Sequence, residues 1–170
     1  MGVFIISPTD KGGHLHTPST KLIECCAPLH PIVFNDLFCL QDNRVHTISV
    51  GASKPDDLKL HLDAVNLLQS SNDLIAQIDH NLKTAALTAL GERWLSTWKD
   101  GLPLWHQTPG NMNIPTMLWL HNLVEAWDME DFAKKRYGLL GNASHWFPGA
   151  NADCLDKDVD EIDLQIALKN

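Results

Sequence analysis

The chain has 170 residues, of which 44% are hydrophobic, and this is the composition of a globular protein that can bury a core. Its net charge of −8 argues against a nucleic-acid partner, because phosphate backbones bind basic surfaces. No apolar run approaches the roughly 20 residues of a membrane span, and the apolar residues 3–6 are too few for a signal peptide. We therefore expect a cytoplasmic protein without a membrane partner.

Strand-like and helix-like segments alternate in the first seventy residues. Residues 2–6 form a β-branched apolar run, GVFII, which is typical of a strand buried on both faces of a parallel sheet. Residues 31–40 predict a helix with proline in its first turn, and residues 45–50 predict a second strand. Ser53 is a candidate N-cap of the next helix. One face of that helix carries an apolar stripe of Leu58, Leu62, Val65 and Leu68. This order predicts an α/β fold with parallel strands.

Helices are predicted for most of the remaining chain. An amphipathic pattern from Asp73 to about Lys99 predicts one long helix, with Gly91 as a point of interruption. Asn113 is a candidate N-cap of a further helix, and residues 128–131 begin a last one that Gly138 ends.

We accordingly divide the chain into three parts. Residues 1–70 form the α/β segment, and residues 71–152 form a helical region. Residues 153–170 form an acidic tail whose few apolar residues have only a weak tendency to pack against the rest of the chain.

The two strand-to-loop junctions carry a resemblance to a known family. Residues 6–13 read ISPTDKGG, and residues 49–58 read SVGASKPDDL. In order and spacing they resemble the last two βα units of the aldo-keto reductase barrel. The predicted bacterial branch of that family is more similar still, because residues 29–40, LHPIVFNDLFCL, match the helix between the two strands. In the helical region the matching motifs are NIP at 113–115, MED at 129–131, RY at 136–137, GNA at 141–143 and HWFPG at 145–149. The resemblance extends to about Ala152.

This resemblance implies a fold and an activity. The fold is the last two βα units of a TIM (β/α)8 barrel, followed by an all-helical C-terminal region. The activity is that of the C-terminal portion of a NADP-dependent oxidoreductase, which transfers hydride with the help of a Tyr, Lys, Asp and His tetrad. The family draws this tetrad from earlier barrel strands, and the single tyrosine of this chain, Tyr137, lies in the appended region. We therefore assign no catalytic residue and expect the chain to be inactive alone.

Candidate cofactor-binding residues lie in the two turns. Small residues after a strand let backbone N–H groups approach a pyrophosphate, and the N-terminus of a helix favours phosphate. By resemblance, Ser53 and Lys54 face the adenosine ribose and any 2′-phosphate, so Lys54 favours NADP over NAD, whereas Asp57 and His61 border the adenine. The family often has Gln and Asn at the last two positions. The candidate residues are Ser7, Pro8, Lys11, Gly12, Gly51, Ala52, Ser53, Lys54, Asp57 and His61. Without the resemblance, we would interpret the same residues only as a helix cap and a flexible loop.

We predict neither a metal site nor an iron–sulfur cluster. The bacterial branch carries clustered cysteines before the NIP motif, but residues 102–110 contain none here. Metal-ligand residue types do occur together at His14, His16, Cys25, Cys26 and His30, but their spacing matches no strong motif. Free, reduced thiols are expected at all four cysteines.

Two parallel strands cannot close a barrel, and their edges need partners. The chain is therefore a fragment of a longer gene product, or it pairs with a separate N-terminal barrel half or with a second copy of itself. An alternative function is that of a non-catalytic interaction module. A third reading is a free-standing helical protein whose βαβ segment is vestigial.

Overall fold

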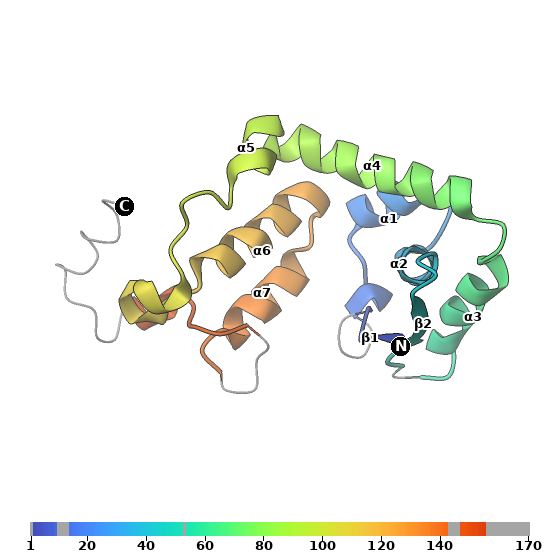
Figure 1. Ribbon diagram of the computed structural model, residues 1–170, viewed down its shortest axis with the longest axis horizontal. Helices are drawn as coiled ribbons and strands as arrows, with labels where there is room; N and C mark the ends of the chain where they lie inside the picture. The colour runs from blue at the N-terminus through green and yellow to red at the C-terminus, as the bar shows by residue number, and fades with distance from the viewer. Residues whose placement is uncertain (1, 10–13, 53, 143–146, 156–170) are drawn as a thin grey trace. The chain divides into compact units, whose positions relative to one another are not determined.

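The computed structural model describes residues 2–9, 14–52, 54–142 and 147–155 (Figure 1). It divides into two compact units, Met1–Ala86 and Leu87–Asn170, so the boundary between them falls within one long helix, α4 (Asn72–Leu90).

The first unit contains a two-stranded parallel sheet. β1 (Val3–Ile6) pairs with β2 (Val45–Ser49), with Phe4 opposite Thr47 and Ile6 opposite Ser49. The predicted α/β class with a parallel pair of strands is confirmed, and β2 ends one residue earlier than predicted.

Three helices and a 3-10 turn complete the architecture around this sheet. They are η1 (His14–His16), α1 (Thr20–Cys26), α2 (Pro31–Leu40) and α3 (Asp57–Leu67). α2 has the predicted bounds, because Pro31 suits the first turn and the His30 imidazole accepts the N–H of Ile32 at 3.2 Å. α1 was not predicted. Its N-cap, Ser19, accepts the N–H of Leu22 at 3.0 Å within a stretch whose Pro and Thr content favours a loop.

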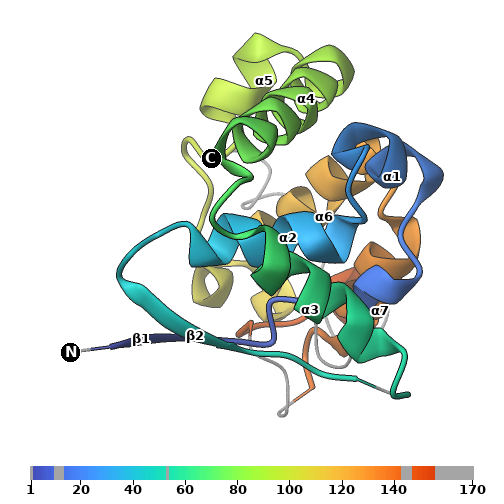
Figure 2. The ribbon, with the colours of Figure 1, turned by 90° about the vertical axis from the view of Figure 1, so that its right-hand side faces the viewer.

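The hydrophobic core of the first unit is centred on α2. Helices α2 and α3 lie on one side of the two strands (Figure 2). Fully or almost fully buried side chains come from four helices: Leu22 and Cys26 of α1, Ile32, Val33, Phe34 and Leu37 of α2, Ala64 of α3, and Ile75 and Ile78 of α4.

The prediction that β1 is buried on both faces is wrong for this chain. Phe4 is 71% exposed and Ile6 is 77% exposed, and Val3 is also exposed. The physical reason is that β2 covers one edge of β1 and the helices cover one side, while no other described residue of the first unit forms a further layer. The apolar composition of this strand is that of a buried strand in a larger sheet.

The apolar stripe of α3 also faces away from the core. Leu62 and Val65 are 62% and 59% exposed, and Leu58 is exposed as well. The helix packs through its other face, where Asp57, His61 and Ala64 are buried. A hydrophobic pattern alone would have placed the helix the other way round. Polar contacts with α2, described below, account for the difference.

The helix predicted over residues 73–99 is interrupted at Gly91, as expected. α4 ends at Leu90, and α5 (Glu92–Thr97) begins after Gly91, whose φ of +78° is a conformation that glycine adopts without strain. The next elements of the second unit are the 3-10 turns η2 (Trp105–Gln107) and η3 (Pro109–Asn111).

Two further helices and a final 3-10 turn follow in the second unit. They are α6 (Ile114–Trp127), α7 (Glu130–Leu139) and η4 (Ala152–Cys154). The prediction that Gly138 ends the last helix is wrong, because α7 continues through it to Leu139. The reversal is made instead at Gly141, where φ is +87°.

Aromatic and amide side chains hold the second unit together. Trp119 contacts Phe132 and Phe147, with ring centroids 6.1 and 5.5 Å away. The Tyr137 hydroxyl accepts the N–H of Ala152 at 3.1 Å, and the Asn151 amide donates to the Tyr137 carbonyl at 3.1 Å. The single tyrosine thus has a structural contact with the segment that follows α7.

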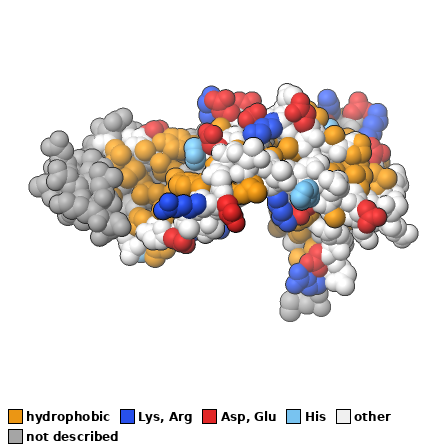
Figure 3. Space-filling view, turned by 90° about the horizontal axis from the view of Figure 1, so that it is seen from above, with side chains coloured by type: hydrophobic (Ala, Val, Ile, Leu, Met, Phe, Trp, Pro, Cys, Tyr) orange, Lys and Arg blue, Asp and Glu red, His pale blue; other side chains and the backbone are white. Residues whose placement is uncertain are grey.

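Charged side chains of both signs are interspersed on the face shown in Figure 3. Ion pairs on the protein surface join side chains three or four positions apart: Lys59 with Asp56, Lys83 with Asp79, and Lys134 with Glu130. Such exposed pairs contribute little to stability. Within the described ranges, no single helix is long and apolar enough to cross a membrane, and only the pair α1 and α2, bent by 51°, reaches that length and composition together.

The Asn113 side chain bonds both to the first turn of α6 and to the segment at Pro148. We therefore expect its substitution to lower the stability of the second unit. Its side-chain oxygen accepts the N–H of Thr116 at 3.0 Å, and its amide donates to the Pro148 carbonyl at 2.7 Å. Asn113→Ala removes both bonds and is expected to lower the free energy of unfolding by about 1–2 kcal/mol.

Denaturation followed by tryptophan fluorescence measures this change, because all six tryptophans lie between residues 94 and 146, in the second unit. Asn113→Ser is the matched control. It keeps a cap acceptor and is expected to lose less than Asn113→Ala, so equal losses would contradict a capping role.

Candidate cofactor-binding site

The turns after the two strands lie at the same end of the sheet, because β1 and β2 are parallel neighbours. Ser7 follows β1 directly, and its N–H donates to the Ser49 carbonyl at 2.9 Å. Its φ of +55° is uncommon for a residue other than glycine, so the chain bends sharply as it leaves the strand. Pro8 is half-buried and Thr9 is fully buried. The end of β1 is therefore tied to the end of β2 by a backbone hydrogen bond.

The turn after β2 presents small residues and one exposed lysine. Gly51 is half-buried, whereas Ala52 and Lys54 are exposed. The backbone N–H of Lys54 donates to the Asp57 carboxylate at 3.1 Å, and the N–H of Asp57 donates to the Lys54 carbonyl at 3.1 Å. These two bonds fix the turn that opens α3, in the manner of one half of a capping box.

Seven of the ten predicted cofactor residues lie within the described part of the chain. Lys11, Gly12 and Ser53 lie outside it. The prediction of Ser53 as the N-cap is wrong, because α3 begins at Asp57 and its N-cap is Asp56. Asp57 and His61 are 4% and 8% exposed, and both contact protein side chains. Their role beside an adenine stays a prediction. The remaining residues, Ser7, Pro8, Gly51, Ala52 and Lys54, all lie on the two turns.

Two buried carboxylates, a buried histidine and a half-buried histidine form a group that connects η1, α2 and α3. His61 Nδ1 lies 2.5 Å from Asp36 Oδ2, and His16 Nδ1 lies 3.7 Å from Asp57 Oδ1. The two imidazole rings meet edge to face, with centroids 6.3 Å apart. We call His16, Asp36, Asp57 and His61 the His–Asp cluster. It explains why the polar face of α3 is the buried one.

Sequence reasoning missed two members of this cluster, His16 and Asp36. A signal was present, since Asp36 lies between Val33 and Leu37 in a helix whose other buried positions are almost all apolar. A carboxylate buried in that setting needs a hydrogen-bond partner. Which residue supplies the partner is a tertiary contact that spans 25 positions, and no local pattern encodes it.

Burial decides the direction of the pKa shift at Asp36. It raises the pKa of Asp36, against the opposing effects of the hydrogen bond and charge of His61 and of the weaker contact with the Asn35 amide at 3.4 Å. Burial also lowers the pKa of His30, and the charge of His16 adds to that effect. At Asp36, therefore, burial disfavours the charged carboxylate more strongly than the contact with His61 favours it.

Three buried polar atoms near these segments lack a hydrogen-bond partner among the described residues: Nε2 of His16, Nε2 of His61 and the Thr9 hydroxyl. The part of the chain that the structure describes contains no group of three His, Cys, Asp or Glu side chains positioned to hold a metal ion.

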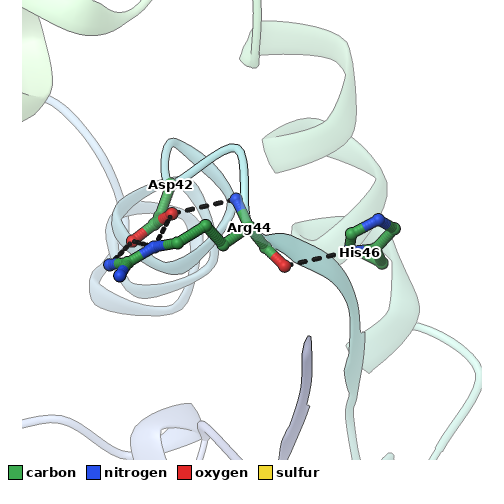
Figure 4. A network of polar contacts seen from close by, with 3 residues as sticks. All are labelled: Asp42, Arg44 and His46. Carbon is green, nitrogen blue, oxygen red and sulfur yellow. Dashed lines mark hydrogen bonds and ion pairs between the residues drawn. The ribbon is translucent and has the colours of Figure 1, made fainter. Parts of the chain in front are cut away.

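The polar network at the start of β2 is exposed and shapes a turn (Figure 4). The Asp42 carboxylate accepts the Arg44 backbone N–H and Nε–H, both at 2.9 Å. These bonds hold the pKa of Asp42 low, at about 2. His46 Nδ1 lies 2.9 Å from the Arg44 carbonyl. The network fixes how the chain enters the strand.

Cys25, Cys26 and Cys39 lack the lowered pKa of an activated nucleophile. All four cysteines are free, and burial raises the pKa of Cys26 to about 12 and also raises those of Cys25 and Cys39. A thiol with a raised pKa carries little thiolate at neutral pH, and thiolate is the reactive form.

No family model matches the chain, no curated protein is significantly similar to it in sequence, and no solved structure is significantly similar to it in fold. The assignment to a family therefore depends on the motifs quoted above and stays a prediction.

The raised pKa of Asp36 predicts how stability depends on pH. Because the folded state binds this proton more tightly than the unfolded state, the contribution of Asp36 to stability is fully present below the unfolded pKa, about 3.9. It is lost as the pH rises through the folded pKa. Asp36→Asn is expected to remove this loss.

Hydrogen–deuterium exchange of the α2 and α3 amides between pH 4 and pH 8 measures the effect without relying on aromatic residues. Asp63→Asn, on the exposed side of α3, serves as the control. A pH dependence that is the same in Asp36→Asn and in the wild type would contradict the prediction.

Proposed function

We propose that the chain is the C-terminal portion of a cytoplasmic, NADP-dependent oxidoreductase of the aldo-keto reductase type. Its first unit would supply the last two βα units of a (β/α)8 barrel. One observation carries the proposal: β1 and β2 are parallel neighbours, and the turns after them lie at one end of the sheet. Barrel enzymes bind their ligands over such turns.

The features of the two turns suit the phosphate end of a dinucleotide. Gly51 and Ala52 leave room for a close backbone approach, and the exposed Lys54 offers a positive charge suited to a 2′-phosphate. The nicotinamide, when bound, supplies the hydride. The residues of this chain would bind and orient the distant phosphates and would not move a proton, because the family's Tyr-containing tetrad has no counterpart here.

The exposed apolar surface supports the need for a second polypeptide. Phe4 and Ile6 on β1 and Leu62 on α3 are 71%, 77% and 62% exposed. Full burial of an aliphatic or aromatic side chain contributes about 1.5–3 kcal/mol. A partner that covered these positions would gain several such contributions and would pair with the open strand edge. The chain alone is therefore expected to be inactive.

A second candidate is a non-catalytic interaction module, and the exposure of β1 is the observation that favours it. An open, apolar strand edge accepts an added strand from another protein through main-chain hydrogen bonds. In this reading the partner is a separate barrel half or a second copy, and the two turns have no ligand.

Co-expression with the product of the upstream reading frame tests the oxidoreductase proposal. The complex is expected to reduce carbonyl compounds with NADPH, whereas the chain alone is expected not to. A stable complex without activity and without NADPH binding would favour the interaction module instead.

Lys54→Ala is expected to weaken NADPH binding to this complex about tenfold and to leave NADH binding unchanged, because one charge-assisted contact to the 2′-phosphate is lost. Isothermal titration calorimetry measures both affinities. The matched control is Lys59→Ala, an exposed lysine one turn further along that pairs with Asp56 at 2.8 Å. Equal effects of the two substitutions, or equal losses for NADPH and NADH, would contradict the role of Lys54.

Phe4→Asp is expected to abolish association with the partner, because a charge in the apolar strand prevents burial. Size-exclusion chromatography with light scattering measures the mass of the complex, and circular dichroism verifies that the variant is folded. The control is Ile23→Asp on α1, an exposed apolar residue away from the strand. Unchanged association of Phe4→Asp would show that β1 is not the contact.

A further inference from the structure

We propose that His16 and Asp57 are positioning residues, which hold η1 and residues 54–57 at the start of α3 in one fixed arrangement. We further infer that this arrangement sets the affinity for the dinucleotide phosphates, and this second step rests on the proposed function.

The Asp57 carboxylate bridges two separate segments. Oδ2 accepts the backbone N–H of Lys54 at 3.1 Å, which fixes the turn that carries the predicted phosphate-binding lysine. Oδ1 lies 3.7 Å from His16 Nδ1, which is an ion-pair distance when the imidazole is protonated. Asp57 is only 4% exposed, so water screens the contact weakly.

The contact between His16 and Asp57 joins the segment that follows β1 to the segment that follows β2. His16 belongs to η1, in the loop that follows β1, and Asp57 is the first residue of α3, which follows β2. The Ser7 to Ser49 hydrogen bond already joins the two segments where they leave the sheet. Asp57 and His16 join them a second time further along the chain, so two separate contacts link the end of β1 and η1 to the segment that follows β2.

The imidazole of His16 is held from its other side as well. It meets the His61 ring edge to face, and His61 is fixed by its bond to Asp36 on α2. The His–Asp cluster therefore connects the loop after β1 through α3 to the central core helix. A change at His16 would be transmitted to Lys54 through the carboxylate of Asp57, although His16 itself is not required to contact a phosphate.

The first test measures the restraint in the chain itself, without any ligand. In Asp57→Ala the Lys54 amide loses its acceptor, and its hydrogen exchange, followed by NMR, is expected to accelerate at least tenfold. Asp57→Asn keeps an oxygen acceptor and is expected to stay within threefold of the wild type. His16→Ala is expected to accelerate exchange at Lys54 severalfold. If Asp57→Ala and His16→Ala both leave the Lys54 amide unchanged, the positioning role is wrong.

The second test measures NADPH affinity in the complex with the partner polypeptide. Asp57→Ala and His16→Ala are each expected to weaken binding at least fivefold, and Asp57→Asn is expected to recover most of the affinity. Asp63→Ala, on the exposed side of α3, is the control. Circular dichroism verifies folding, and if Asp57→Ala is unfolded, His16→Ala carries the test.

The two proposals fail in different ways. If the wild-type complex does not bind NADPH, the proposed function is wrong, and the amide exchange still decides whether His16 and Asp57 restrain the turns. If the wild-type complex binds NADPH and both alanine variants bind it equally well, the cluster only stabilises the fold, and the further inference is overturned.

Discussion

Two parallel strands with helices on one side form an open sheet, and this constraint governs the first unit. Each strand has one edge hydrogen-bonded to the other, and the described residues provide no further strand. The apolar side chains of β1 consequently remain in contact with solvent, although their composition suits a buried layer. The first unit therefore has a packed core, but the apolar side chains of its strand β1 are left exposed on the outside.

The open sheet and one buried hydrogen-bonded pair, Asp36 and His61, together explain which face of α3 is buried. The helix could bury either its leucine stripe or the side that carries His61, and the structure buries the latter. A hydrogen-bonded pair such as Asp36 and His61 is costly to break, because each group would remain desolvated without its partner. The apolar stripe is then left for contacts outside the unit, on the same chain segment that carries the predicted phosphate-binding turn.

Local chemistry was sufficient to predict many elements from the sequence. The Pro31 start of α2, the Gly91 break and the Asn113 cap each have a physical cause within a few residues, and all three occur in the structure. The errors come from tertiary context. Burial of β1 depends on whether a further layer covers the strand, and the first unit provides helices on one side only. For the candidate site, the two turns were predictable from the strand ends, whereas the contacts of Asp57 with His16 and of His61 with Asp36 span 25 or more positions.

The open edge of β1 also bears on how the chain behaves in solution. An unpaired apolar strand is a template on which identical chains can stack edge to edge. The net charge of −8 opposes this stacking, because like-charged copies repel one another. That repulsion is long-ranged only at low ionic strength, since the Debye length falls to about 10 Å at 0.1 M salt. We therefore expect concentrated salt to weaken this repulsion and to favour association of free chains through the strand.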